Sequence, residues 1–118
     1  MRTRTLAFGL YADERDVARV AGLVEAQARA RGARVVAVTV SDVLPSGEMT
    51  AGEAYDFLAE QWADEHSGQD PGARRAVDLR VAVVCSLRTW RAIRKAALRG
   101  LCPEGNAPHV CRVPWFAG

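Results

Sequence analysis

Short apolar runs alternate along this chain with stretches in which apolar residues recur every three or four positions. The runs at 5–11, 34–40 and 79–85 are rich in β-branched and other apolar side chains, which is typical of buried strands. Helical spacing follows the first run up to about residue 31, appears again after residue 50, and returns at about 88–99. A fourth strand is predicted at 109–113.

Capping and turn residues support these boundaries. Asp13 is expected to cap the first helix, and Gly32 to end it. Thr50 and Glu53 match a capping box that opens the second helix, which carries Tyr55, Leu58 and Trp62. The clearest turn in the chain is 67–72, with the sequence SGQDPG.

The order strand, helix, strand within the first 40 residues predicts a β-α-β unit with parallel strands. The expected fold is therefore a single α/β domain over residues 1–118. It would be a three-layer αβα sandwich on a short parallel sheet of about four strands, flavodoxin-like or of related topology.

Composition adds a compartment and a charge pattern to this picture. The longest apolar run, Val81 to Cys85, is far too short to span a membrane, and no signal peptide is evident. Three cysteines without a paired pattern also favour a cytoplasmic protein, and the abundance of Ala, Arg, Val and Gly suggests a bacterial genome of high GC content. The net charge is +2, but residues 48–70 carry seven acidic side chains and no Lys or Arg, whereas 71–118 carry nine basic and two acidic ones.

Polar residues follow the predicted strands. In an open parallel sheet, ligands bind beyond the carboxyl ends of the strands, so these residues are expected to line one crevice. A second interpretation stays open, in which Asp13 and Ser86 cap helices and Asp42 organises a turn. The crevice residues are Tyr11, Asp13, Arg15, Ser41, Asp42, Ser46, Ser86, Arg88 and Arg91.

Motifs for the common chemistries are missing. Neither a phosphate-binding glycine loop nor the G-x-S-x-G elbow of serine hydrolases occurs. Only two histidines, His66 and His109, could serve as the base of a serine hydrolase. Cys85, Cys102, His109 and Cys111 lack the tight C-x-x-C spacing of a zinc site, which favours ordinary buried thiols. No cofactor or metal is predicted.

The helix at about 88–99 is strongly basic. One side is apolar, and much of the remaining surface is cationic with no acidic residue between the cations, a pattern that phosphate backbones favour. A solvated face with extended basic side chains is the alternative. The cations are Arg88, Arg91, Arg94, Lys95 and Arg99.

Four short segments together resemble the catalytic domain of the serine recombinases, the resolvases and invertases. Tyr11 ends the first strand, Glu25-Ala26-Gln27 matches E-x-Q, and Asp42 precedes Ser46-Gly47 as in D…SG. Leu87-Arg88-Thr89-Trp90-Arg91 stands where that family has D-R-x-x-R. The resemblance spans most of residues 4–113, and it implies a resolvase-like sheet with Gln27 among the binding residues.

Departures from the family pattern imply that the chain does not catalyse recombination. Where the family has Y-x-R-x-S, Asp13 and Arg15 occupy the arginine and the nucleophilic serine positions, and Arg15 cannot attack a phosphodiester because it stays protonated. Leu87 replaces an aspartate, and the arginine expected after S-G falls near Gly52. No counterpart of the family's long helix and DNA-binding tail is expected before Gly118.

Three functions stay open at this stage. The first is a non-catalytic, recombinase-like domain that binds an anionic partner, nucleic acid or protein, through the crevice and the basic helix. The second is a small-molecule or nucleotide-binding protein, or an enzyme of flavodoxin-like topology, that uses the same crevice. The third is a structural partner, for example a homodimer, that pairs through a sheet edge or through the tail at 113–116, whose sequence is VPWF.

Overall fold

The computed structural model describes residues 1–45, 47–101 and 113–118. Strands and helices alternate along most of this length. In chain order they are β1 (Arg2–Ala12), α1 (Glu14–Ala30), β2 (Arg34–Ser41), α2 (Ala51–Ala54), α3 (Asp56–Glu65), β3 (Arg75–Cys85), α4 (Leu87–Leu101) and β4 (Trp115–Ala117).

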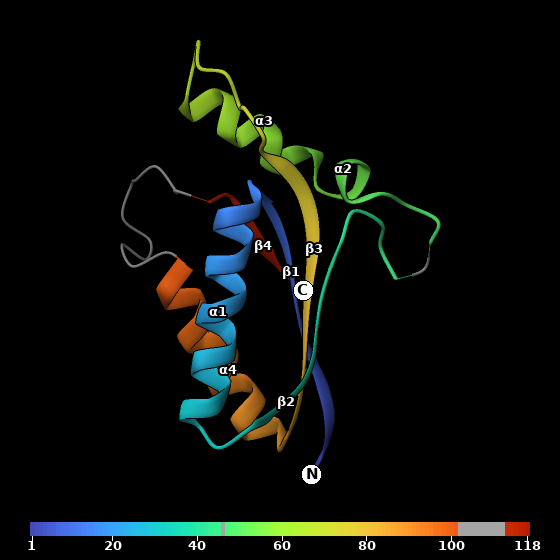
Figure 1. The fold of residues 1–118 in the computed structure, drawn as a ribbon, viewed down its shortest axis with the longest axis vertical. Coiled ribbons are helices and arrows are strands. Elements are labelled where there is room, and N and C mark those ends of the chain that lie inside the picture. Colours follow the sequence, from blue (N-terminus) through green and yellow to red (C-terminus); the bar gives the residue numbers. More distant parts are fainter. Residues whose placement is uncertain (46, 102–112) are drawn as a thin grey trace.

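The four strands form one sheet in the order β2-β3-β1-β4, and every neighbouring pair is antiparallel. β1 and β3 pair along their whole length, from Arg2 opposite Cys85 to Ala12 opposite Arg75. Figure 1 shows the sheet from its side, with β1 and β3 running through the middle of the molecule. The parallel sheet expected from the sequence is therefore wrong.

The reason for this error lies in the position of β3. β1 and β2 do point the same way, as a β-α-β unit requires, but β3 lies between them and runs in the opposite direction. The α1 crossover thus skips one strand position, and α4 connects β3 to β4 across β1 in the same manner. This β-α-β-β-α-β order is the split, ferredoxin-like arrangement, here with α2 and α3 inserted between β2 and β3.

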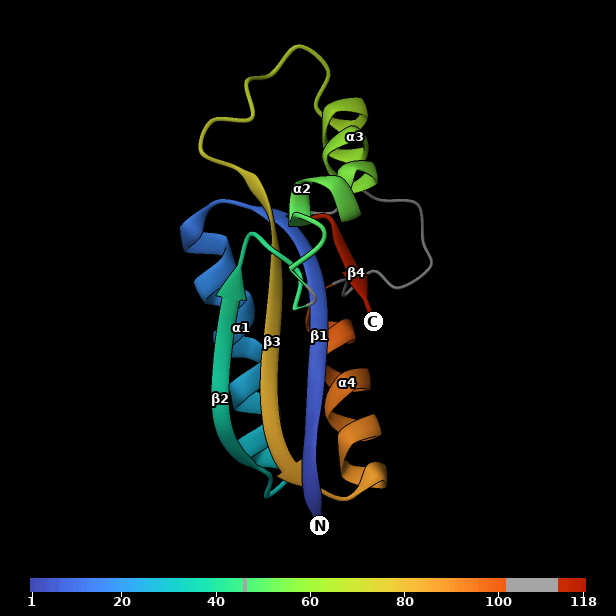
Figure 2. The same ribbon diagram turned by 90° about the vertical axis from the view of Figure 1, so that its right-hand side faces the viewer.

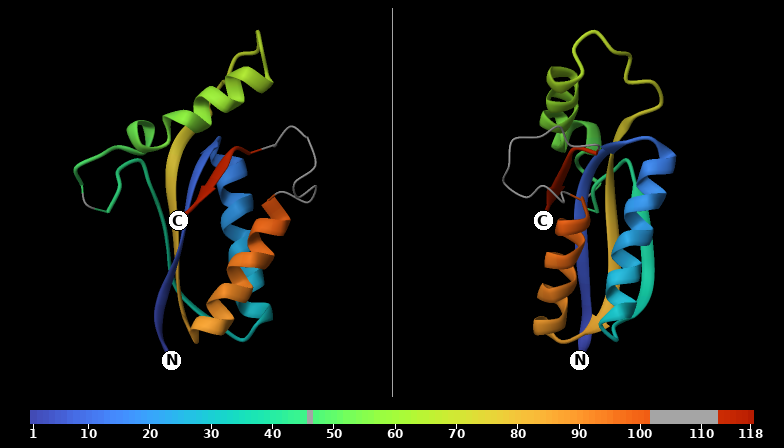
Figure 3. Two further views of the ribbon diagram at one scale, coloured as in Figure 1. Left: turned by 180° about the vertical axis from the view of Figure 1, so that it is seen from behind. Right: turned by 90° about the vertical axis from the view of Figure 1, so that its left-hand side faces the viewer.

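The two long helices cover the same face of the sheet. Figures 1 and 3 show α1 and α4 side by side against it, and their apolar faces pack on Leu, Phe and Val side chains that alternate along β1 and β3. On the opposite face, α2 and α3 lie over one end of the sheet only (Figure 2). The expected three-layer sandwich is thus replaced by two layers over most of the sheet. The largest fully buried side chains include Phe8, Leu6, Leu10, Leu79, Ile93, Val20, Val24, Val77, Val81 and Val83.

Local predictions from the sequence succeed better than the topology. The Asp13 carboxylate accepts a hydrogen bond from the Asp16 amide at 2.8 Å and caps α1, and Gly32 takes a positive φ of 75° where that helix ends. Thr50 caps α2 by accepting from the Glu53 amide at 3.1 Å. The second helix is interrupted at Tyr55, however, and continues as α3.

The C-terminal residues complete the sheet. Of the fourth strand expected at 109–113, residues 109–112 lie outside the described residues, and β4 is formed instead by Trp115–Ala117. The Tyr11 amide donates to the Pro114 carbonyl and the Gly118 amide to the Ala7 carbonyl, so the tail is held on β1 of its own chain. Across the described residues, the helices are too short or too polar to cross a membrane.

Candidate functional site

The antiparallel sheet separates the residues that were expected to share one crevice. Tyr11 pairs with Ala76 near one end of β3, whereas Cys85, at the other end of β3, pairs with Arg2. Ser86 and Arg88 follow Cys85 directly, so they lie at the opposite end of the sheet from Tyr11. The prediction of a single crevice is wrong, because it required the C-terminal ends of β1, β2 and β3 to lie at the same end of the sheet.

At the Tyr11 end, the predicted residues have local structural roles. Asp13 caps α1, and the Ser41 hydroxyl accepts a hydrogen bond from the Val43 amide at 3.1 Å. The Asp42 carbonyl accepts from the Ala51 amide at 2.7 Å, which fixes the entry to α2. Ser46 lies outside the described residues, and ligand binding by the others stays a prediction.

The remaining motif residues are also engaged within their own helices. The Gln27 side chain accepts from Arg31 at 2.6 Å, and Glu25 lies 3.5 Å from Arg29 in an ion pair. The Ser86 hydroxyl accepts from the Thr89 amide at 3.2 Å and so caps α4. Ser86 thus has the capping role that was the alternative to a binding site, and binding by Gln27 stays a prediction.

A shallow groove runs instead between α4 and the N-terminal half of β1. It consists of three adjoining hollows, and Trp90, Leu87, Arg2 and Arg4 each line more than one of them. The hollow beside α4 has a volume of about 550 Å³, and the next one about 310 Å³. We call this surface the β1–α4 groove. Its lining residues are Met1, Arg2, Thr3, Arg4, Thr5, Ser86, Leu87, Trp90, Arg91, Arg94, Lys95, Leu98 and Gly118.

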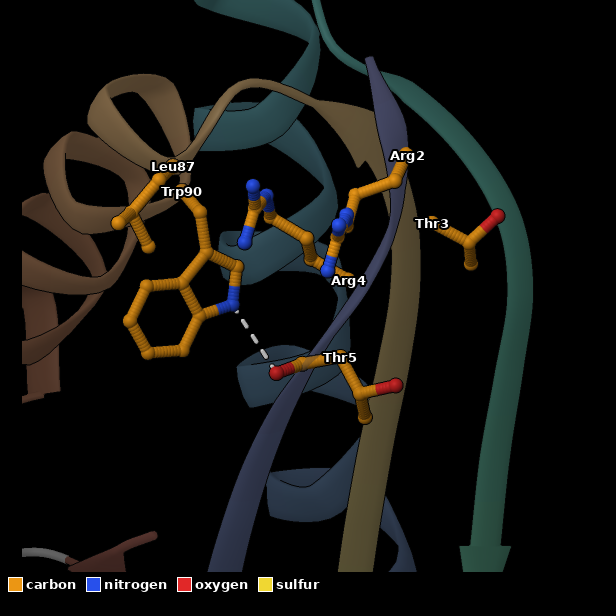
Figure 4. A pocket seen from close by; sticks show the side chains of 6 residues that line it. All are labelled: Arg2, Thr3, Arg4, Thr5, Leu87 and Trp90. Carbon is orange, nitrogen blue, oxygen red and sulfur yellow. Dashed lines mark hydrogen bonds between the residues drawn. The ribbon is translucent and has the colours of Figure 1, made fainter.

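The floor of the groove is built by alternation along β1. Figure 4 shows Arg2 and Arg4 on the α4 side of the strand, while Thr3 and Thr5 point to the other face. The Trp90 indole nitrogen donates to the Thr5 carbonyl at 3.0 Å, so the ring is held against the strand. The Arg4 Nε donates to the Cys85 carbonyl at 3.3 Å, which anchors that arginine at the edge of the groove.

The charged side chains that line the groove all carry the same sign. Neither β1 nor α4 contains an acidic residue, and together they carry six arginines and one lysine. Within residues 1–45, 47–101 and 113–118, the ion pairs of 4.0 Å or less join other residues: Arg19 with Asp16, Arg29 with Glu25, and Arg80 with Asp78. The groove cations are thus unpaired in the described part of the chain.

The sequence identified part of this surface. The five cations of α4 were predicted as a basic strip, but Arg2 and Arg4 were not connected with it. The period-two pattern R-T-R-T at positions 2–5 was the available signal, since alternation along a strand places every second side chain on the same face. The partner of that face could not be identified without the order of the strands.

A second polar cluster lies on the other face of the sheet. Asp78 is only 2% exposed, and it accepts from the Tyr55 hydroxyl at 2.9 Å and from Arg80 Nε at 2.7 Å. Burial, together with the hydrogen bond to Asp78, raises the pKa of Tyr55 to about 12. Gly9 lies beneath the Tyr55 ring, where a Cβ would approach Cε1 to 2.6 Å. This cluster therefore fastens the α2–α3 segment to the sheet.

The groups in this cluster satisfy one another, so we assign it a structural role rather than a binding one. Among the residues that the structure describes, no three His, Cys, Asp or Glu side chains gather as metal ligands. Cys85 is buried, and Cys102, His109 and Cys111 lie outside the described residues.

No protein-family model, curated protein or solved structure matches the chain.

Proposed function

We propose that this protein binds a single-stranded nucleic acid, and that the phosphate backbone lies along the β1–α4 groove. The observation that carries the proposal is the one-sided charge of this surface: cations from two elements far apart in the sequence line one groove, and no carboxylate lies on either element. Kinship with the recombinases is not part of the proposal, because the sheet lacks the parallel order on which it depended.

Bidentate hydrogen bonding and the release of counterions explain why such a groove favours phosphates. Guanidinium groups bind phosphate oxygens in a bidentate manner, and each neutralised phosphate releases condensed counterions into solution. Arg2 and Arg4 line two of the hollows from the strand, and Arg91, Arg94 and Lys95 line the third from the helix, so a backbone that follows the groove would meet cations of both elements in turn.

Trp90 gives this surface a second property of single-strand binders. Its ring is half-buried, lines two of the three hollows, among them the one of about 550 Å³, and is fixed in place through its indole nitrogen. Exposed aromatic rings beside a cationic groove stack on unpaired bases, which a duplex does not offer. We therefore expect single strands to bind more tightly than duplexes of the same sequence.

The test is fluorescence anisotropy with labelled single strands of about 12 nucleotides, DNA and RNA, at about 50 mM salt. Replacing Arg91 by Ala is expected to raise the Kd by about three- to tenfold and to reduce the dependence of log K on log salt by about 0.7. The matched control is Arg29→Ala, which removes the same charge from α1, where Arg29 is paired with Glu25. This control should change the Kd by less than about twofold.

Two results would contradict the proposal. The first is the absence of binding to any strand at low salt. The second is an equal loss in Arg91→Ala and Arg29→Ala, because net charge rather than the groove would then control binding. A polyglutamate peptide of matched charge serves as competitor, and displacement at equal concentration would indicate an acidic protein as the partner instead.

A further inference from the structure

Two arginines reach into the same part of the β1–α4 groove. Arg2 and Arg4 stand two positions apart on β1, and both line the hollow of about 310 Å³ and a neighbouring one of about 330 Å³. Figure 4 shows their side chains extending from the strand towards Leu87 and Trp90 on α4. Among the described residues, no acidic side chain lines either hollow, so two positive charges are held together there without a counter-charge.

The two guanidinium groups are held differently, and both have donors that can bind a ligand. Arg2 is exposed, and it forms no hydrogen bond or ion pair with another residue that the structure describes. Arg4 donates its Nε to the Cys85 carbonyl, and Cys85 is the residue that lies opposite Arg2 on β3. This bond holds the Arg4 guanidinium near Arg2 and leaves its two terminal nitrogens to bind an anion.

The first turn of α4 adds backbone donors at the same place. Ser86 and Leu87 line the hollow of about 330 Å³, and Ser86 caps the helix by accepting from the Thr89 amide. Leu87 and Arg88 are the first two residues of α4, so their amides have no acceptor within the helix. Such amides carry a positive partial charge and favour anions. We call this surface the arginine corner, and it consists of Arg2, Arg4, Ser86 and Leu87.

We propose that the arginine corner binds a terminal phosphate monoester of the single strand whose backbone follows the groove. The inference rests on the proposed function and adds the end of the strand to what the groove recognises. A monoester carries nearly two negative charges at neutral pH and exposes three acceptor oxygens. An internal diester carries one charge and exposes two such oxygens. A pair of guanidinium groups therefore gains more from a monoester, because each group can bind two of its oxygens.

The position of the corner also fits the end of a strand. β1 begins at Arg2, opposite Cys85, where β3 ends, so the corner lies at one end of the sheet. Arg91, Arg94 and Lys95 line the hollow further along α4, where internal diesters would be neutralised. A strand in the groove would thus place its terminal phosphate at the corner and its internal phosphates beside α4.

The test uses single strands of about 12 nucleotides and one sequence, with the fluorophore on an internal base. The strands carry a 5′-phosphate, a 3′-phosphate or hydroxyl groups at both ends, because the corner could receive either end. Fluorescence anisotropy at about 50 mM salt gives the three Kd values. One of the two phosphorylated strands is expected to bind at least about fivefold more tightly than the hydroxyl strand.

Two arginine variants locate the site of this preference. Arg2→Ala should reduce the preference for the phosphorylated strand to less than about twofold, since the corner then has one guanidinium left. Arg91→Ala is the matched control, because Arg91 is equally an exposed arginine but lines only the hollow of about 550 Å³ among those of the groove. It should weaken the binding of all three strands by the same factor and leave the preference unchanged.

Each contrary result overturns a defined part of this reasoning. Equal binding of the three strands by the wild type overturns the inference and leaves the proposed function standing. A preference that persists in Arg2→Ala, or that is lost equally in Arg91→Ala, overturns the assignment to the arginine corner. Absence of binding by all three strands overturns the proposed function and this inference together.

Discussion

The hydrogen bond between Tyr55 and Asp78 offers a sharp test of how the α2–α3 segment is held. The Tyr55 hydroxyl donates to Asp78 Oδ1, and Asp78 is almost fully buried. In Tyr55→Phe this carboxylate keeps Arg80 but loses one donor, and a buried charged group with an unmet acceptor is destabilising.

The pKa of Tyr55 gives the magnitude. A rise from 10.0 to about 12 corresponds to roughly 2.7 kcal/mol for a fully buried group, at about 1.36 kcal/mol for each pKa unit. Because desolvation of the phenolate is the largest cause of this rise and Tyr55 is half-buried, only part of it reflects the hydrogen bond that Tyr55→Phe removes, and we expect this variant to lower the free energy of unfolding by about 1–1.5 kcal/mol. In a chain of this size that corresponds to a fall in Tm of roughly 4–8 °C.

The sign of the pH dependence follows from the same shift. Because the pKa of Tyr55 is higher in the folded protein than its ordinary value, the neutral hydroxyl stabilises the fold. This contribution is fully present below pH 10 and is lost as the pH rises towards 12. The stability difference between wild type and Tyr55→Phe should therefore be constant from pH 7 to about 9 and then shrink.

Urea denaturation followed by tryptophan fluorescence measures both quantities. The matched control is Tyr11→Phe, because Tyr11 is the second of the two tyrosines and its hydroxyl bonds to no other described residue. We expect that control to change the free energy of unfolding by less than about 0.5 kcal/mol. The reasoning is refuted if the two variants lose the same stability, or if the Tyr55→Phe difference persists unchanged at about pH 12.

Two further substitutions test other contacts. Gly9→Ala would place a Cβ 2.6 Å from the Tyr55 ring and should lower the free energy of unfolding in urea by about 1–3 kcal/mol. Gly22→Ala is the control, because nothing lies within 4 Å of the added Cβ, and it should stabilise α1 by up to about 1 kcal/mol. Equal effects of the two substitutions would contradict the close approach of Tyr55 to Gly9. Asp13→Ala removes the cap of α1 and should cost about 1 kcal/mol in the same assay, with Asp13→Asn recovering most of it; a neutral Asp13→Ala would show that the cap contributes little.

Local structure was predictable from the sequence because its determinants are local. Alternating or continuous apolar runs identified β1, β2 and β3, although β1 and β3 extend further than the apolar runs themselves. Asp13, Gly32 and Thr50 marked helix ends through single side chains or a single backbone conformation. The break at Tyr55 was not visible, since it depends on the ring reaching Gly9 on β1 and Asp78 on β3.

The order of the strands could not be derived in the same way. The two strands of a strand-helix-strand unit are parallel whether they are neighbours or are separated by a third strand. The sequence up to residue 41 therefore does not show whether another strand lies between β1 and β2. The near-continuous apolar pattern of β2 favoured burial on both faces, yet β2 lies at the margin with Val38 and Val40 exposed. An exposed edge made of valines resembles a buried strand when composition is the only guide.

The candidate site was misplaced for the same reason. Strand direction decides which loop junctions share an end of the sheet, so one wrong direction moved Ser86 and Arg88 to the far end from Tyr11. The basic character of α4 did not depend on topology and was predicted correctly as a charge pattern. Its combination with Arg2 and Arg4 required the knowledge that α4 lies against β1.

The brevity of β4 has a consequence for how large any assembly can grow. β4 spans three residues and pairs with Phe8, Gly9 and Leu10, so within the described residues the N-terminal half of β1 has a strand neighbour on its β3 side but none on its β4 side. That stretch carries Arg2 and Arg4 and is capped by the Trp90 indole, which discourages another strand from joining there. Of the two edges of this sheet, only that of β2 is open to another strand. Edge-to-edge pairing between copies would therefore stop at two chains instead of continuing into fibres.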